Sequence, residues 1–289
     1  MKQLWSKDTE KKFFNESFDF ATPEQLFNLS NDSRYFAYWP KTYKGKTSTL
    51  QSRNSLIGSF SEKWTTDLLQ EIASNLGLYA VKGAVCEQLS LPKNSSADVV
   101  ISTSKDVYQK AENIRAIIEV KMSIVWNWEY KDRALYCLGD YHTHKGNPGL
   151  LRSDSMLKAI GKSINVRISC SKASSIPIIV MGNTPITKNY YSKVDHLKRT
   201  GIIQGFWSVN PNPSDIRVTE LKQTKGKGFI KFDDYEELKS SFVSLLSENR
   251  YYFSSMKTNL ELGKIIEQAN LEVTYEKKAE KFLELLKEN

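Results

Sequence analysis

The feature that most constrains the fold of this chain is the segment Ala116–Met122 (AIIEVKM), a short apolar run that contains one acid and one base. Its β-branched residues favour a strand, in which successive side chains point to opposite faces of a sheet. Glu119 and Lys121 are two residues apart, so we expect them on one face, with Ile118 and Val120 on the opposite, core-facing side. An acid beside an amine on an otherwise apolar strand indicates a polar site at the edge of a core.

A second acid stands at the head of another apolar run. Asp98 opens the segment 98–102, and twenty residues separate it from Glu119. Two carboxylates on adjacent strands can point into one pocket, and oxygen ligands of this kind are those that Mg²⁺ prefers. Asp98, Glu119 and Lys121 together therefore predict a divalent-metal site with a lysine beside it. The alternative for Glu119 and Lys121 is an ion pair on an exposed sheet face, which contributes little to stability.

The elements around these residues predict an α/β (α+β) protein with a mixed central sheet flanked by helices. An amphipathic helix is expected over residues 59–76, with Ser61 as its N-cap and Glu62 in its first turn. Beyond it we expect strands at 78–85, 98–102 and 115–124, a helix from Ser153 or Asp154 to about 164, a strand at 176–181, a helix at 188–199 and a strand at 201–209.

This pattern resembles the PD-(D/E)XK nuclease superfamily, whose best-known members are restriction endonucleases. The resemblance rests on Asp98, on the Glu119-Val120-Lys121 triplet and on the helix–strand–strand–strand–helix–strand order between residues 62 and 209. Ser-Ala precedes Asp98 where the name of the motif has Pro, a departure that the family tolerates. The resemblance implies a restriction-endonuclease-like core with additional helical elements at both ends of the chain.

The resemblance also implies roles for individual residues. Asp98, Glu119 and the Val120 carbonyl would hold Mg²⁺, with Mn²⁺ able to take its place, and Lys121 would orient the attacking water. Glu62 is similar to the helix acid that adds an outer contact to the metal, and Glu71 is the alternative for that role.

The remaining composition sets limits on the class of protein. The chain has 289 residues and a net charge of +8, and a basic balance suits a partner that carries phosphates. No apolar run is long enough to cross a bilayer, and we find no signal peptide. Three widely spaced cysteines favour neither a disulfide framework nor a zinc site. These features suit a cytoplasmic protein with no membrane association.

Aromatic and basic residues interleave in two stretches outside the predicted site, residues 31–57 and 125–151. Surfaces that stack on bases and neutralise phosphates have this composition. In each stretch the alternative is a local aromatic core or a solvated face. Two histidines in the second stretch lack a third ligand for zinc. The residues expected to contact DNA are Tyr38, Trp39, Lys41, Lys44, Lys46, Arg53, Trp128, Lys131, Arg133, His142, His144, Lys145, Arg152 and Lys158, with Lys162 one turn further along the same helix as Lys158.

These predictions combine into one functional hypothesis. Residues 1–58 would be an N-terminal extension, 59–213 the catalytic core, and 214–289 a basic loop with helices packed on that core. The chain would be a Mg²⁺-dependent type II restriction endonuclease that cleaves double-stranded DNA as a homodimer and belongs with a cognate DNA methyltransferase. The alternatives are a structure-specific repair, resolvase-like or phage nuclease of the same fold, and a non-catalytic DNA-binding protein.

Overall fold

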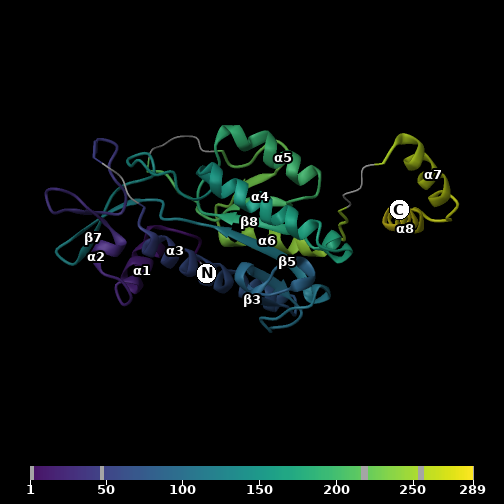
Figure 1. Ribbon diagram of the computed structural model, residues 1–289, viewed down its shortest axis with the longest axis horizontal. Coiled ribbons are helices and arrows are strands. Elements are labelled where there is room, and N and C mark those ends of the chain that lie inside the picture. The colour runs from purple at the N-terminus through teal and green to yellow at the C-terminus, as the bar shows by residue number, and fades with distance from the viewer. Residues whose placement is uncertain (1–2, 46–48, 216–220, 253–256, 289) are drawn as a thin grey trace.

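A six-stranded mixed sheet forms the centre of the computed structural model, which describes residues 3–45, 49–215, 221–252 and 257–288 (Figure 1). The sheet has the order β10-β9-β8-β5-β4-β3, antiparallel from β3 to β5 and parallel from β5 to β10. β5 thus lies where the two halves of the sheet meet. The strands are β3 (Tyr79–Ala84), β4 (Ala97–Ser102), β5 (Ile114–Lys121), β8 (Ile178–Gly182), β9 (Gly205–Ser208) and β10 (Phe229–Lys231).

Helices cover both faces of this sheet, which confirms the expected mixed α/β architecture. One face packs against α3 (Gln51–Asn75) and α6 (Tyr235–Ser247), and Ile118 and Val120 lie in that core as predicted. The other face packs against α4 (Ser153–Arg167) and α5 (Tyr191–Arg199). Because side chains alternate along β5, Glu119 points to the face that α4 covers.

Helix α3 begins eight residues before its predicted start at residue 59. Ser61 is not its N-cap but a buried residue inside it, where its hydroxyl donates to the Gly58 carbonyl over 2.9 Å. Residues 51–58 contain no proline, so the helix continues through them without losing a backbone donor. Glu62 is therefore well inside α3, away from the N-terminal end of the helix dipole, and the expected boundary at residue 58 falls within one helix.

A second, four-stranded antiparallel sheet forms from segments for which no strand was predicted, in the order β1-β2-β6-β7. Its strands are β1 (Asn28–Leu29), β2 (Tyr35–Phe36), β6 (Asn127–Lys131) and β7 (Ala134–Gly139). Asp132 and Arg133 turn the β6–β7 hairpin with φ angles of 51° and 59°. Two consecutive left-handed residues are typical of a tight hairpin turn, but Asp-Gly or Asn-Gly is its usual sequence.

The N-terminal helix α1 (Lys7–Ser17) is attached to the chain that follows β5 through one buried carboxylate. Glu10 accepts hydrogen bonds from the indoles of Trp5 and Trp128, over 3.2 and 2.9 Å, and from the amides of Val125 and Trp126, over 2.6 and 3.3 Å. Burial raises the pKa of Glu10 to about 7, against the effect of these four donors. Helix α2 (Pro23–Leu26) follows with Thr22 as N-cap and Pro23 in its first turn.

The C-terminal helices differ in where they pack. α6 lies on the sheet as expected, whereas α7 (Asn259–Ala269) and α8 (Tyr275–Glu288) pack on each other and stand apart from the sheet in Figure 1. The prediction that all C-terminal helices pack on the core is thus wrong for this pair, whose buried residues include Ile265 and Leu286. In the described ranges, no helix is both long and apolar enough to cross a membrane.

Candidate active site

The predicted site lies at the C-terminal end of β5. β4 and β5 pair with Val99 opposite Ile118, a register that sets Asp98 next to Glu119 on the face covered by α4. The Asp98 carboxylate also accepts a hydrogen bond from the Val120 amide, with 2.7 Å between Oδ2 and N. Strand pairing and this bond together fix two carboxylates at one point of the sheet, as the sequence predicted.

Two lysines bridge these carboxylates. Lys121 Nζ lies 2.5 Å from Glu119 Oε1 and 3.7 Å from Asp98 Oδ2. Lys162, from α4, places its Nζ 2.7 Å from Glu119 Oε2 and 3.3 Å from Asp98 Oδ1. The four side chains form a compact cluster of two negative and two positive charges. The sequence did not identify Lys162 as a member, although its position on the helix that covers this face was the available signal.

The cluster is largely shielded from solvent but stays accessible through its lysines. Glu119 is 5% exposed, whereas the side chains of Lys121 and Lys162 are 21% and 22% exposed. Burial acts to lower the pKa of Lys162, but the charges of Glu119 and Asp98 outweigh it and leave that pKa raised. Lys162 therefore stays protonated at neutral pH and holds the two carboxylates together.

Glu62 is the α3 acid that comes near this cluster. Its Oε2 lies 3.5 Å from Lys82 Nζ, and its pKa is raised by burial and, next, by the negative charge of Asp98. Glu71, the alternative, is exposed and exerts its charge on Tyr235 instead. The environment of Glu62 thus fits the predicted outer position better than that of Glu71.

The donor atoms at this point fit a hard divalent cation. Among the described residues, no three His, Cys, Asp or Glu side chains group together as metal ligands. The predicted set, however, needs only the carboxylates of Asp98 and Glu119 and the Val120 carbonyl, because Mg²⁺ usually keeps several waters. The two lysines now neutralise the oxygens that such a cation would bind. Lys121 also donates to the Val120 carbonyl over 3.1 Å.

Two loops carrying predicted DNA-contact residues lie beside the site. The Lys145 amide donates to the Trp39 carbonyl over 3.0 Å, and the Lys41 amide to the Thr143 carbonyl over 3.3 Å, so the loops are joined through their backbones. The Tyr38 hydroxyl is 3.2 Å from the Ser123 hydroxyl, which follows β5. Lys41, Lys44 and Lys145 are exposed on these joined loops, which the contact between Tyr38 and Ser123 connects to the chain that follows β5.

Four other residues expected to contact DNA have side chains that are buried within the protein: Trp39, Arg53, Trp128 and His144. Arg53 hydrogen-bonds through its guanidinium to the carbonyls of Leu26 and Ala37. His144 stacks on Tyr38 with 4.1 Å between ring centroids, and burial lowers its pKa to about 4. These residues make the structural contacts that the sequence analysis named as the alternative.

The remaining predicted contacts are spread over the surface. Arg152 is exposed and pairs with Asp154 over 2.7 Å, while His142 is half-exposed beside Asp140. Lys158 is exposed on α4, and Lys131 and Arg133 are exposed at the β6–β7 turn. Lys46 lies outside the described residues. None of these positions conflicts with contact to DNA.

No protein-family model, curated protein or solved structure matches this chain. The resemblance to PD-(D/E)XK nucleases therefore rests on Asp98, Glu119 and Lys121 and on the element order that brings them together.

Proposed function

We propose that this protein is a Mg²⁺-dependent endodeoxyribonuclease with a restriction-endonuclease-like core. The observation that carries the proposal is the meeting of the Asp98 and Glu119 carboxylates with the Lys121 ammonium group at the end of β5. Hydrolysis of a phosphodiester needs positive charge on the non-bridging oxygens and an activated water. Two carboxylates and an amine at one point supply a cation site and a group that handles water.

Each group at the site has a defined task in this proposal. When bound by Asp98, Glu119 and the Val120 carbonyl, Mg²⁺ supplies the charge that polarises the phosphate and makes water more acidic. Lys121 donates a hydrogen bond that orients the attacking water and counters negative charge in the transition state. The Val120 amide holds Asp98 in place, and Lys162 holds Glu119 from α4.

The charge distribution supports double-stranded DNA as the substrate. The net charge is +8, and exposed Lys41, Lys44 and Lys145 lie on the paired loops beside the site. We propose cleavage at a short specific sequence in the cytoplasm, giving 5′-phosphate ends, with a cognate methyltransferase protecting the host DNA. A homodimer would match the two-fold symmetry of a palindromic site.

One observation favours a second candidate, a non-catalytic DNA-binding protein. The two negative and two positive charges of the cluster already balance one another. The cluster could therefore have a purely structural role, in which it connects α4 to β4 and β5. Both candidates predict DNA binding, and they differ in whether the DNA is cut.

Digestion of supercoiled plasmid with Mg²⁺ tests the proposal. We expect discrete fragments, no cutting in EDTA, and no cutting by Asp98→Ala despite retained binding. A smear, or cutting confined to branched DNA, would support a structure-specific nuclease instead. Retardation of the plasmid without cleavage, in both Mg²⁺ and Mn²⁺, would support the non-catalytic candidate and contradict the proposal.

A further inference from the structure

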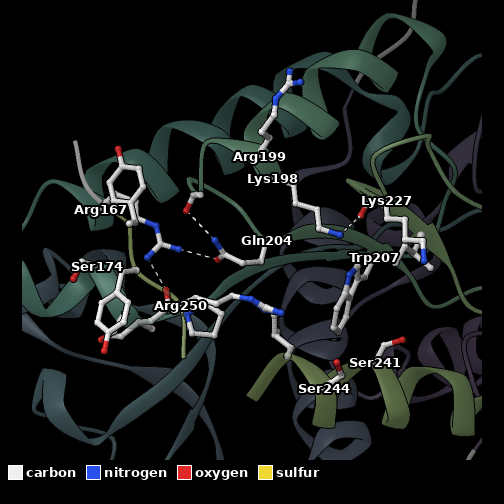
Figure 2. Close-up of a pocket in the computed structure, with 18 of the residues that line it drawn as sticks. Arg167, Ser174, Lys198, Arg199, Gln204, Trp207, Lys227, Ser241, Ser244 and Arg250 are labelled. Carbon is white, nitrogen blue, oxygen red and sulfur yellow. Dashed lines mark hydrogen bonds between the residues drawn. The ribbon is translucent and has the colours of Figure 1, made fainter. Parts of the chain in front are cut away.

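A cavity of about 710 Å³ lies far from the cluster of Asp98 and Glu119, between the end of α5 and the side of α6 (Figure 2). Pro177 and Gln204, in its wall, precede β8 and β9, whereas Lys121 ends the parallel strand β5. The cavity therefore opens at the opposite end of the parallel strands from the proposed nuclease site.

The lining of this cavity is strongly cationic. Among its described lining residues none is an acid, and five carry a guanidinium or ammonium group: Arg167, Lys198, Arg199, Lys227 and Arg250. Figure 2 shows Lys198 and Lys227 on one wall, and Arg250 on the other side, facing them across the cavity. Such a concave, one-sign lining attracts anions.

Two of these cations have only neutral hydrogen-bond partners inside the protein. Arg167, 4% exposed, donates to the carbonyls of residues 173, 176 and 202 and to the Gln204 side chain. Lys198 donates to the Lys227 carbonyl over 3.0 Å. The pKa of Lys198 is lowered by burial and then by repulsion from Arg250 and Lys227. Arg250 itself pairs with Glu248, which lies outside the lining.

Neutral hydrogen-bond donors and aromatic rings complete the wall. Ser241 and Ser244 present hydroxyls from α6, and Trp207 lies opposite them (Figure 2). Tyr252 packs against the Arg167 guanidinium, 5.4 Å from its ring centroid. Hydroxyls and cations suit phosphate oxygens, and aromatic side chains suit a flat ring.

We propose that this cavity binds a nucleoside polyphosphate. A volume of about 710 Å³ is within the range of small-molecule sites and far exceeds the needs of one inorganic phosphate. Arg167 and Trp207 are each 4% exposed, so the backbone of duplex DNA would not reach this deep part of the cavity. The groups that a small ligand in the cavity would contact are Lys198, Arg250 and the serine hydroxyls of α6. The proposal is independent of nuclease activity, because it uses none of the residues around Glu119.

Calorimetric titration of the full chain with ADP and with pyrophosphate, in EDTA and low salt, tests the proposal. We expect saturable binding of one ADP per chain, tighter than that of pyrophosphate. Lys198→Gln and Arg250→Gln should each weaken ADP binding by about 10- to 100-fold, because each removes a charge-assisted hydrogen bond. Lys158→Gln, an exposed lysine on α4, is the matched control and should bind as the wild type does.

Three results would overturn the proposal. They are absence of saturable ADP binding, equal weakening in Lys158→Gln, and pyrophosphate binding as tight as that of ADP. A loss of duplex-DNA affinity in Lys198→Gln and Arg250→Gln without any ADP binding would assign this surface to DNA instead. Circular dichroism of each variant establishes that it is folded, and Lys121→Ala should retain ADP binding whether or not the protein cuts DNA.

Discussion

Lys162 on α4 is tied to Glu119 on β5, with 2.7 Å between Nζ and Oε2. Lys121 occupies the other oxygen of the same carboxylate, so each Glu119 oxygen has its own ammonium partner. This arrangement connects a helix to the strand that carries the proposed catalytic groups. It also lets two lysines neutralise, in the protein alone, the charge that a divalent cation would otherwise neutralise.

Replacing Lys162 with alanine should destabilise the metal-free protein by about 1–3 kcal/mol, because a shielded pair of carboxylates loses one of its two counter-charges. Mg²⁺ should restore part of that loss by supplying the missing charge. Urea unfolding with and without Mg²⁺ measures both effects. Lys158→Ala, one turn earlier and exposed, should change stability by less than about 0.5 kcal/mol. Equal loss in both variants would contradict the role given to Lys162.

Glu10 should make stability fall as the pH rises. Its pKa is about 7 in the folded protein against 4.5 for the unfolded chain, so folding takes up a proton between these values. The contribution is fully present below pH 4.5 and is lost as the pH passes about 7, on the order of 3 kcal/mol in total. Glu10→Gln should show a shallower fall across this window in urea unfolding. Glu16→Gln, exposed on the same helix, should keep the wild-type slope; identical slopes in all three proteins would refute the assignment.

Replacing Arg53 should lower the stability of the fold and leave the affinity for DNA unchanged. Its guanidinium supports two carbonyls and lies over Tyr38, 4.9 Å from the ring centroid, so Arg53→Ala leaves a void and an unpaired Leu26 carbonyl. We expect a loss of about 1–3 kcal/mol in urea unfolding. The salt dependence of DNA affinity should stay unchanged. A stable variant with weakened DNA binding would instead support the original prediction of a direct contact.

Lys41 and Lys44 should show the opposite behaviour. Both are exposed on the loop beside the end of β5, so alanine at either position should leave the unfolding free energy within about 0.5 kcal/mol. If each neutralises one phosphate, each variant should reduce the slope of log affinity against log salt by about one. Fluorescence anisotropy of labelled duplex DNA at several salt concentrations measures this slope. Lys105→Ala, which replaces a lysine on the loop between β4 and β5, is the control. Slopes equal to that of the wild type in both the Lys41 and the Lys44 variant would show that this loop does not contact DNA.

The sequence was sufficient to predict that Asp98, Glu119 and Lys121 lie close together, because strand geometry alone determines their placement. Alternation along β5 sets Glu119 and Lys121 on one face, and the apolar run after Asp98 marks the neighbouring strand. Lys162 was not identified as a partner of Glu119, because its approach to that carboxylate depends on how α4 crosses the sheet. No spacing along the chain encodes that crossing.

The aromatic and basic stretches show where sequence patterns stop being informative. Trp128 and Lys131 lie three residues apart in the same strand, yet Trp128 is buried against Glu10 while Lys131 is exposed at the hairpin turn. Composition alone does not separate a DNA-contact surface from an aromatic core with basic residues around it. The turn at Asp132-Arg133 lacks glycine, so the β6–β7 hairpin had no usual turn signal either.

The most direct test of the account is the rate at which Lys121→Ala cleaves plasmid DNA with Mg²⁺, measured beside its DNA affinity. We predict a rate at least 100-fold below that of the wild type, with affinity changed less than threefold, because the proposed mechanism has Lys121 act on water and on transition-state charge. Lys105→Ala, on the loop between β4 and β5, should cleave at the wild-type rate. Cleavage by Lys121→Ala at the wild-type rate would contradict the assignment of this site.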